Sequence, residues 1–376
     1  MKKLTDICDI QYGYAFDSKC FTEDSSYPQL VRIRDVKKGY SETYYSGDYP
    51  EEYILSEDDL LVGMDGEFNI ARWKCSGALL NQRVCRLTAK VGTNEEYLRF
   101  AMSKSLKEIE QRTAFVTVKH LSAKELNKLE LDVPELSKQD KIADTLSRLE
   151  RVIESRQEEL EKLDDLIKAR FVEMFGDPDI NPKGWTECAL SEKLNVVGGY
   201  AFKSNMFDED GGIPVLRIGN INAGYFKPVN LVYWQEDEDL ERYAMYPGDL
   251  VMSLTGTVGK DDYGNVCILG DDYEMYYLNQ RNAKLEIKEG IDKFYIAQLL
   301  KFEQIKKKLT GISRGVRQAN ISNKDILNLV VPVPPMELQN QFADFVNQVD
   351  KSKVAVQKAL TETQLLFDSL MQQYFG

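Results

Sequence analysis

The sequence contains one module twice, and this repeat constrains the fold more than any other feature. Gly13-Tyr14-Ala15-Phe16 recurs as Gly199-Tyr200-Ala201-Phe202, and Asn81-Gln82-Arg83 recurs as Asn279-Gln280-Arg281. The separation between the two copies drifts between 185 and 200 residues, as small insertions in loops would cause. We therefore expect two modules of one fold, at 1–176 and 177–376.

Both modules show the same order of predicted elements. Short β-rich segments punctuated by glycine, aspartate and asparagine come first, and an amphipathic helix follows near 94–111 and near 292–309. A short strand then ends at a proline, at Val133-Pro134 and at Val333-Pro334. The last part of each module, 135–175 and 336–375, lacks glycine and proline and is predicted to be one long helix.

The two long helices carry seam positions at alternating steps of three and four residues, most of them apolar. Such a repeat, sustained over several heptads, is typical of a coiled coil. We expect the helices to pack together antiparallel, although each could instead pack only on its own module. Polar residues interrupt the seams at different layers, which would fix the register: Arg156 and Arg170 in the first helix, Lys353 and Thr363 in the second. A helix of about 39 residues spans roughly 58 Å, so the pair could set the distance between the two modules.

Composition excludes several classes of protein. Hydrophobic residues make up 43% and charged residues 29% of the chain, as in ordinary globular proteins. We expect no membrane span, because no apolar run reaches about 18 residues, and no secretory signal, because Lys2-Lys3 precedes no apolar segment. The six cysteines form no C-x-x-C pair and the single histidine is His120. Reduced thiols in a cytoplasmic protein are therefore expected rather than a zinc site.

The formal net charge is −13. This balance argues against a chain that binds DNA by its overall charge. It leaves room for local basic surfaces, and it suits a protein that also docks onto other subunits.

Several strings resemble the specificity subunits of Type I restriction-modification enzymes. Segment 174–178 (Met-Phe-Gly-Asp-Pro), followed by Asn-Pro-Lys-Gly-Trp at 181–185, resembles the junction between their central helix and second recognition domain. Segments 246–251 and 255–260 resemble the core of their target recognition domains, and 59–69 with 80–84 occupy the same places in the first module. Segment 331–339 is also characteristic. The similarity covers essentially the whole chain, in the family's order of domain, helix, domain, helix.

The repeat and the resemblance together predict an α+β fold. It consists of two tandem α/β target recognition domains separated by two long helices that pack as an antiparallel coiled coil, with a pseudo-two-fold repeat. The expected domains are a first target recognition domain at 1–134, a central long helix at 135–176, a second target recognition domain at 177–335 and a distal long helix at 336–376.

The resemblance also implies a function and a set of partners. Each recognition domain would read one half of a bipartite, asymmetric sequence in double-stranded DNA, while the helices set the spacer and bind two methyltransferase (modification) subunits. The chain itself would be non-catalytic and would hold no cofactor or metal. S-adenosylmethionine, ATP and Mg²⁺ would be used by partner subunits, with restriction subunits as a further partner that the resemblance allows.

The residues themselves argue against an enzyme. No G-x-G pair is present, and the string that ends in Gly259-Lys260 lacks the first glycine and the final Ser/Thr of a phosphate-binding loop. Glu286-Ile287-Lys288, with Asp271 or Asp272 upstream, could be half of a metal-dependent nuclease site. A solvent-facing strand of alternating charges is the commoner explanation.

Base contacts require Arg, Lys, Asn, Gln, Ser or Thr side chains at groove edges. The strongest candidate segment is 310–320, a glycine-containing loop after three consecutive lysines, which offers Arg314, Arg317, Gln318 and Asn320. Its counterpart in the first module is less polar and offers Arg112, Lys119 and His120. Such divergence within a shared frame is expected of two modules that read different half-sites. An ordinary helix-to-strand loop with solvated charges is the alternative interpretation.

Further candidates are isolated cations, each of which is more simply explained as a surface charge. They are Arg34, Lys37, Lys38, Arg72 and Lys74 in the first module and Lys260 in the second. The repeated Gly-Tyr-Ala-Phe string is predicted to be structural, with Phe16 and Phe202 in the core. The repeated Asn-Gln-Arg string is predicted to cap or support a strand rather than to read DNA.

Three functions compete on these observations. The leading hypothesis is a DNA-recognition and scaffolding subunit that directs methylation and restriction. A self-sufficient enzyme is disfavoured by the missing motifs. The third is a coiled-coil adaptor that binds only proteins and has no DNA specificity.

Overall fold

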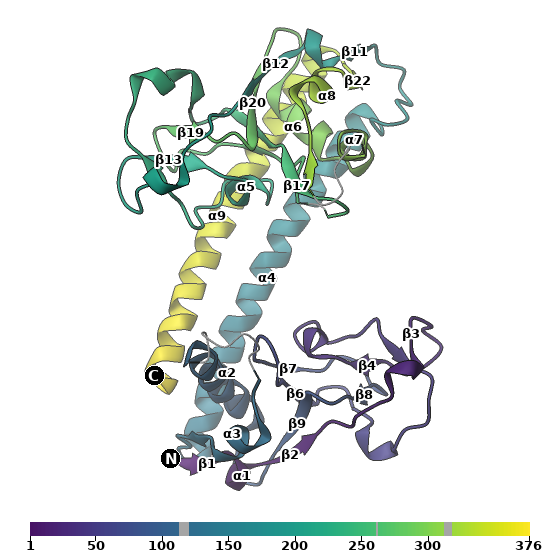
Figure 1. Cartoon of the computed structure of the whole chain (residues 1–376), viewed down its shortest axis with the longest axis vertical. Helices are drawn as coiled ribbons and strands as arrows, with labels where there is room; N and C mark the ends of the chain where they lie inside the picture. Colours follow the sequence, from purple (N-terminus) through teal and green to yellow (C-terminus); the bar gives the residue numbers. More distant parts are fainter. Residues whose placement is uncertain (113–119, 261, 312–317) are drawn as a thin grey trace. The chain divides into compact units, whose positions relative to one another are not determined.

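The computed structural model of the chain describes residues 1–112, 120–260, 262–311 and 318–376 (Figure 1). The chain divides into two compact units. Unit 1 comprises Met1–Glu158 and Gln357–Gly376, and unit 2 comprises Glu159–Val356. Each of the two long helices therefore contributes one part to each unit.

The core of unit 1 is a four-stranded antiparallel sheet in the order β2-β9-β6-β7, accompanied by a short parallel pair, β4-β8. Apolar side chains of this sheet and of helix α2 form one buried cluster, which includes Leu60, Val62 and Leu98. The elements are β1 (Lys2–Lys3), α1 (Leu4–Ile7), β2 (Cys8–Tyr12), η1 (Ser18–Cys20), β3 (Phe21–Thr22), β4 (Leu30–Val31), η2 (Ile33–Asp35), β5 (Tyr44–Tyr45), η3 (Glu51–Tyr53), β6 (Leu60–Gly63), β7 (Asn69–Arg72), β8 (Leu79–Leu80), β9 (Val84–Ala89), α2 (Glu95–Arg112), α3 (Ala123–Lys128) and β10 (Glu130–Leu131).

Unit 2 is built on an equivalent antiparallel sheet in the order β12-β20-β16-β18, and a second sheet has the order β14-β13-β19-β15. The parallel pair β13-β19 corresponds to β4-β8 of unit 1. The elements are β11 (Glu187–Ala189), η4 (Leu190–Glu192), β12 (Leu194–Gly198), η5 (Ser204–Met206), β13 (Ile213–Leu216), α5 (Ile218–Ile221), β14 (Tyr233–Trp234), η6 (Glu238–Tyr243), β15 (Ala244–Met245), β16 (Leu250–Ser253), β17 (Thr255–Thr257), β18 (Val266–Ile268), β19 (Tyr276–Leu278), β20 (Asn282–Ile287), α6 (Lys293–Lys301), α7 (Glu303–Thr310), β21 (Gln318–Asn320), α8 (Asn323–Leu327) and β22 (Val330–Pro332).

The repeated Gly-Tyr and Asn-Gln-Arg strings lie against each other in both units. The tyrosine after each glycine forms a parallel bridge with the asparagine. A Cβ atom at Gly13 would lie 2.0 Å from the carbonyl oxygen of Asn81, and one at Gly199 would lie 2.1 Å from that of Asn279. Only glycine allows so close an approach of two backbones, so the structural role predicted for these strings is confirmed.

The two stretches without glycine or proline form the long helices α4 (Leu136–Phe175) and α9 (Met336–Phe375). The predicted seams run from Ile142 to Met174 on α4 and from Phe342 to Tyr374 on α9, and every seam position is buried or half-buried. In unit 1, Ile142 near the start of α4 belongs to the same cluster as Phe367 near the end of α9. In unit 2, the rings of Phe171 near the end of α4 and Phe342 near the start of α9 have centroids 5.5 Å apart. The helices therefore pack antiparallel in each unit, as predicted.

A fully buried glutamine joins each long helix to the helix of its own module. Gln139 accepts a hydrogen bond from the backbone N–H of Asn94, just before α2, at 2.9 Å. Gln339 accepts the same bond from Asp292, just before α6, at 2.8 Å. The two modules therefore correspond residue by residue at these helix starts.

The predicted helix near 292–309 is wrong in one respect, because unit 2 has two helices there, α6 and α7. The chain leaves helical geometry at Phe302, whose φ and ψ are −66° and 131°. This turn buries the Phe302 ring against Phe171 of α4, with centroids 5.0 Å apart. Burial of an aromatic side chain compensates for the interrupted helix. In unit 1 the corresponding helix α2 continues unbroken.

The six cysteines are free thiols, of which Cys8, Cys85 and Cys267 are buried. Burial raises the pKa of Cys8 and of Cys267 to about 12, which keeps both protonated at neutral pH. Within the described part of the chain, no helix has the length and apolar character required to cross a bilayer.

Candidate nucleic-acid interface

The strongest predicted DNA-binding loop starts and ends at fixed points of unit 2. At its start, the hydroxyl of Tyr263 donates to the carbonyl oxygen of Thr310 at 3.0 Å. At its end, β21 pairs with β17, so that Asn320 lies opposite Thr255. The hydroxyl of Thr255 donates to the side-chain oxygen of the exposed Asn320 at 3.1 Å. The loop is thus held at both ends by the strand–turn segment 255–264.

The remaining candidates of this loop are not all described. Arg314 and Arg317 lie outside the described residues. Gln318 is the first residue of β21 and lies opposite Thr257. Their assignment to DNA contact therefore stays a prediction.

Lys260 lies in the turn that follows β17, and the structure shows how that turn is fixed. Its backbone N–H donates to the carbonyl oxygen of Thr257 at 3.0 Å. The carboxylate of Asp262 accepts from the N–H of Thr257 at 2.7 Å. This backbone hydrogen bond, aided by the charge of Lys260, lowers the pKa of Asp262. A Cβ at Gly256 would overlap the same carboxylate, at 2.2 Å, so the turn requires glycine there. Lys260 is exposed on this turn.

Helix α7 brings its three consecutive lysines to the start of the same loop. The ammonium of Lys306 donates to the side-chain oxygen of Asn265 at 2.6 Å, which connects α7 to the segment between β17 and β18. Lys307 pairs with Glu303 on its own helix at 2.5 Å, and Lys308 pairs with Asp179 at 2.8 Å. Lys260 thus borders the same hollow in unit 2 as Lys306 and Lys307 of α7, which are far from it in sequence.

In unit 1, His120 occupies the place that Asn320 has in unit 2. It forms a bridge with Asp65, as Asn320 pairs with Thr255. The Asp65 carboxylate contacts both the His120 ring and, at 3.5 Å, the guanidinium of Arg83. Of the other candidates here, Arg112 is exposed at the end of α2, and Lys119 lies outside the described residues.

Four of the isolated cations predicted in unit 1 gather around the turn that follows η2. Arg34 lies 3.9 Å from the neighbouring Asp35, and Lys37 pairs with Glu67 at 3.0 Å. The ammonium of Lys38 lies 5.9 Å from the ring centroid of Tyr40. The stem of Lys74 covers Gly39 of the same turn. The side chains of Arg34 and Lys37 remain 67% and 58% exposed, so either could reach a phosphate.

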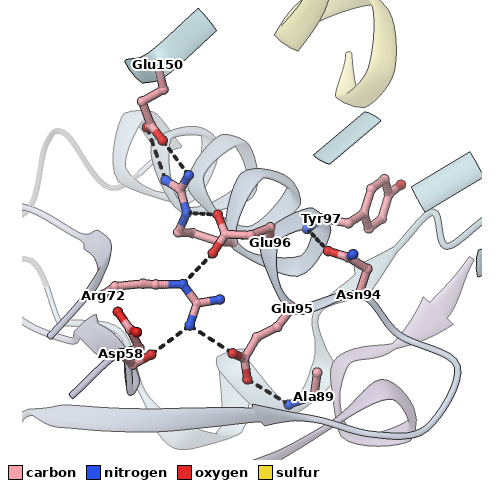
Figure 2. Close-up of polar contacts among 9 residues, drawn as sticks. Asp58, Arg72, Ala89, Asn94, Glu95, Glu96, Tyr97 and Glu150 are labelled. Carbon is pink, nitrogen blue, oxygen red and sulfur yellow. Dashed lines mark hydrogen bonds and ion pairs between the residues drawn. The ribbon is translucent and has the colours of Figure 1, made fainter. Parts of the chain in front are cut away.

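Arg72 differs from these surface cations because acidic partners hold it on several sides (Figure 2). Its guanidinium pairs with Glu95 at 2.9 Å and with Glu96, and it donates to the carbonyl oxygen of Asp58 at 2.6 Å. Only 28% of its side chain is exposed. These contacts account for Arg72 as the residue that joins β7 to the start of α2.

The network around Arg72 extends to the long helix α4. Arg99 donates to Glu96 at 2.8 Å and forms a two-bond pair with Glu150 of α4, at 3.1 and 2.5 Å. Glu96 thus accepts hydrogen bonds from both arginines, and Figure 2 shows the bond that it accepts from Arg72. Burial raises the pKa of Glu96, but Arg99 and Arg72 outweigh that effect and the net shift is downward. The sheet, the module helix and α4 of unit 1 are thereby connected through charged groups.

The repeated Asn-Gln-Arg string contributes a side chain that sequence reasoning set aside. Arg83 has a positive φ of 73°, which is uncommon for arginine, and its side chain is 51% exposed. One of its guanidinium nitrogens lies 3.1 Å from the His120 ring. In unit 2, the carbonyl oxygen of the exposed Arg281 accepts a hydrogen bond from the backbone N–H of Leu254, the residue just before β17. Arg83 thus lies beside the His120 segment of unit 1, and the backbone of Arg281 lies beside the start of β17 in unit 2. Spacing along the chain could not reveal either proximity.

The metal-site alternatives raised by the sequence can be compared with the described residues. Among them, no group of three or more His, Cys, Asp or Glu side chains could hold a metal ion. In the suspected nuclease string, the Lys288 ammonium donates to the carbonyl oxygen of Ser191 at 2.8 Å. That contact accounts for Lys288 as a residue that ties the end of β20 to η4.

Comparisons with known proteins agree with this two-module design. The model of the Type I restriction modification DNA specificity domain matches residues 1–164 and again 182–364. The chain is 28% identical to the Type I restriction enzyme EcoBI specificity subunit of Escherichia coli, over 99% of this chain and 84% of that protein. It is 25% identical to the MjaVIII specificity subunit of Methanocaldococcus jannaschii, over 82% and 78% respectively. The solved S subunit of a Type-I restriction-modification system from M. genitalium has the same fold, with a TM-score of 0.57, 16% identity and coverage of 100% and 95%.

Proposed function

Because this chain belongs to the family of the Type I restriction modification DNA specificity domain, we propose that it is the DNA-reading subunit of a Type I restriction-modification complex. Each module reads one half of a bipartite, asymmetric sequence in double-stranded DNA. The long helices set the spacing between the two halves. Sequence is read by side chains at groove edges, while cations and backbone amides hold phosphates.

The observation that carries this proposal is the double match to the specificity domain on two modules with different polar residues in equivalent places. Asp65 and His120 of unit 1 stand where unit 2 has Thr255 and Asn320. The backbone frame around each pair is the same, because the N–H groups of Leu121 and Ile321 donate equivalent bonds to the carbonyl oxygens of the residues that follow β6 and β16. A common frame with different donors and acceptors suits the reading of two different half-sites.

The proposal includes the partners that supply the chemistry. Two methyltransferase subunits dock on the helices and transfer methyl groups from S-adenosylmethionine, and restriction subunits, which use ATP and Mg²⁺, complete the restricting complex. The chain itself is non-catalytic and holds no cofactor. Its net charge of −13 suggests weak DNA binding by the isolated chain, with much of the phosphate contact supplied by the modification subunits.

Methylation mapping in cells tests the proposal directly. Cells that express the chain together with its modification subunit are compared with cells that lack the chain. We expect a bipartite methylated motif only when the chain is present. Replacement of residues 1–134 by the same segment of a relative should change one half of that motif and leave the other half and the spacer intact.

The competing functions predict different results, one in this mapping experiment and one in a separate nicking assay. A coiled-coil adaptor that binds only proteins would leave the methylation pattern unchanged when the chain is removed or its first module is exchanged. A self-sufficient nuclease would nick DNA in the presence of a divalent metal without partners. Either result would contradict the proposed function.

A further inference from the structure

Unit 2 contains a hollow between the turn after β17 and the helices α6 and α7. Its volume is about 850 Å³, and it ends at Thr310 and Gly311, where the candidate loop begins. The charged residues among its described lining are Lys260, Lys301, Lys306, Lys307 and Glu303. We name this hollow the lysine groove.

The lysine groove concentrates positive charge on a strongly acidic chain. Among the described residues that line it are four lysines and one glutamate, whereas the chain as a whole carries a net charge of −13. Glu303 is paired with Lys307, Lys301 interacts with Asp164 and Asp350, and the charge of Lys260 helps to lower the pKa of Asp262. Lys260 and Lys307 are nevertheless exposed, so both ammonium groups can turn toward an anion in the groove. Such a local surface attracts a polyanion.

The walls of the groove are fixed by hydrogen bonds rather than left to mobile side chains. Lys306 is only 8% exposed, and its ammonium is held at 2.6 Å by Asn265. Asn265 in turn contacts the side chain of Asn222 at 3.4 Å, and Asn222 donates to the carbonyl oxygen of Asp262 at 2.6 Å. Asp262 fixes the turn that carries Lys260. The backbone that carries Lys260 is therefore fixed before an anion binds, which limits the entropy lost to the ordering of exposed side chains.

The sequence of the first module lacks lysines at the positions equivalent to three lysines of the groove. The offset of 198 residues that relates the starts of α2 and α6 places Ser103, Glu108 and Ile109 where the second module has Lys301, Lys306 and Lys307. The end of α2 therefore mixes acidic and basic residues, while α7 carries three lysines in succession. The two modules differ in charge at this place as well as in their loops.

We propose that the lysine groove seats the sugar–phosphate backbone of bound DNA beside the half-site of the second module, with Lys260 and Lys307 each contacting a phosphodiester. This inference rests on the proposed function and adds an asymmetry to it. The groove holds the backbone and reads no bases, since lysine acts as a flexible point charge rather than a directional reader. The second module therefore contributes more of the salt-dependent binding than the first.

The test removes the two exposed lysines, Lys260→Gln and Lys307→Gln, in the full chain assembled with its methyltransferase subunits. Binding is measured by fluorescence anisotropy over a series of salt concentrations, on a duplex with the mapped motif and on a scrambled duplex. Each lost phosphate contact should lower the slope of log affinity against log salt by about 0.9, so the double variant should lose about 1.8. Both duplexes should be affected by the same factor.

Two control variants separate charge in the groove from charge in general and from misfolding. Lys203→Gln with Lys227→Gln removes two exposed lysines of unit 2 outside the groove and should leave the slope unchanged. Lys260→Arg with Lys307→Arg keeps the charge and should retain the wild-type slope.

An unchanged slope in the Gln double variant, with the wild-type preference for the motif intact, overturns the groove proposal alone. A selective loss of motif binding also overturns it, because the lysines would then read bases. If the wild-type complex binds both duplexes equally, the proposed function itself is contradicted, whatever the groove variant does.

Discussion

Replacement of Arg99 by methionine tests whether the charged network of unit 1 stabilises the fold. Arg99 bonds to Glu96 and to Glu150 of α4, and its side chain is only 14% exposed. Methionine keeps an unbranched apolar side chain on α2 but removes all of these bonds. Glu150 then loses its bidentate partner, while Glu96 keeps Arg72.

The expected cost lies between the values for surface and for buried ion pairs. An exposed pair contributes at most about 1 kcal/mol, and breaking a fully buried pair costs about 3–5 kcal/mol. The carboxylates here are 29% and 35% exposed, so water can partly replace the arginine. We expect a loss of about 2 kcal/mol in the free energy of unfolding of unit 1. For a unit of this size that corresponds to roughly 4–8 °C in Tm.

The second module shows how the same place can be filled without charges. By strand register and helix start, Arg72, Glu96 and Arg99 correspond to Ile268, Phe294 and Ala297, which pack in the apolar core of unit 2. In unit 1 the arginines cannot be replaced in the same way, because Glu95 and Glu150 would keep their charges without the arginines that bind them. Removing one member of an ionic cluster leaves its partners uncompensated, and that is the costly step.

Trp73 provides a probe for unit 1. It is fully buried in that unit, whereas Trp185 and Trp234, the two other tryptophans, belong to unit 2. In a Trp185→Phe, Trp234→Phe background, urea unfolding followed by Trp73 fluorescence reports on unit 1. Arg148→Met is the control, because its pair with Asp144 is 70% and 55% exposed and its loss should stay within about 0.5 kcal/mol.

An Arg99→Met variant that is no less stable than the Arg148→Met control would refute this reasoning.

The pH dependence gives an independent check on the same network. The net downward shift of the Glu96 pKa means that its contribution to stability is fully present above the ordinary glutamate value of 4.5. The contribution is lost as the pH falls from 4.5 through the lower pKa of the folded state. The stability difference between wild type and Arg99→Met should therefore be constant near neutral pH and should shrink below 4.5. A difference that grows on acidification would contradict the assignment.

Two further substitutions probe the packing of unit 2. Phe171→Ala removes a fully buried ring that packs on four aromatic neighbours and should lower the free energy of unfolding by about 3–5 kcal/mol; calorimetry on the full chain should show no such loss for Val172→Ala, whose side chain is exposed. Gly199→Ala forces a Cβ against the carbonyl of Asn279 and should cost about 3 kcal/mol. Gly219→Ala is the control, because a Cβ there meets open space and the backbone φ is not positive; it should leave the free energy of unfolding unchanged or slightly higher. Both glycine variants are measured by urea titration, and equal effects would contradict the close-approach argument.

The repeat, the module order and the bounds of the long helices could be predicted from the sequence by itself, because each depends on local patterns. Absence of glycine and proline over forty residues, together with a seam of three- and four-residue steps, leaves few alternatives to a paired helix. The divergent polar loops of the two modules were visible for the same reason. The break at Phe302 was not, since it depends on the burial of one ring against α4, a neighbour distant in sequence.

The grouping of side chains was decided only by the tertiary structure. Arg72 and Lys74 stand two residues apart on one segment, yet Arg72 is bound by Glu95 and Glu96 while Lys74 covers Gly39. Lys260 and Lys307 are separated by 47 residues and line one groove. Ion pairs and clusters of cations form where residues distant in sequence come together in the fold. The positions of the cations along the chain are compatible with many different sets of such pairs. Local periodicity determines the elements, but long-range packing determines which charges are neutralised and which remain available to DNA.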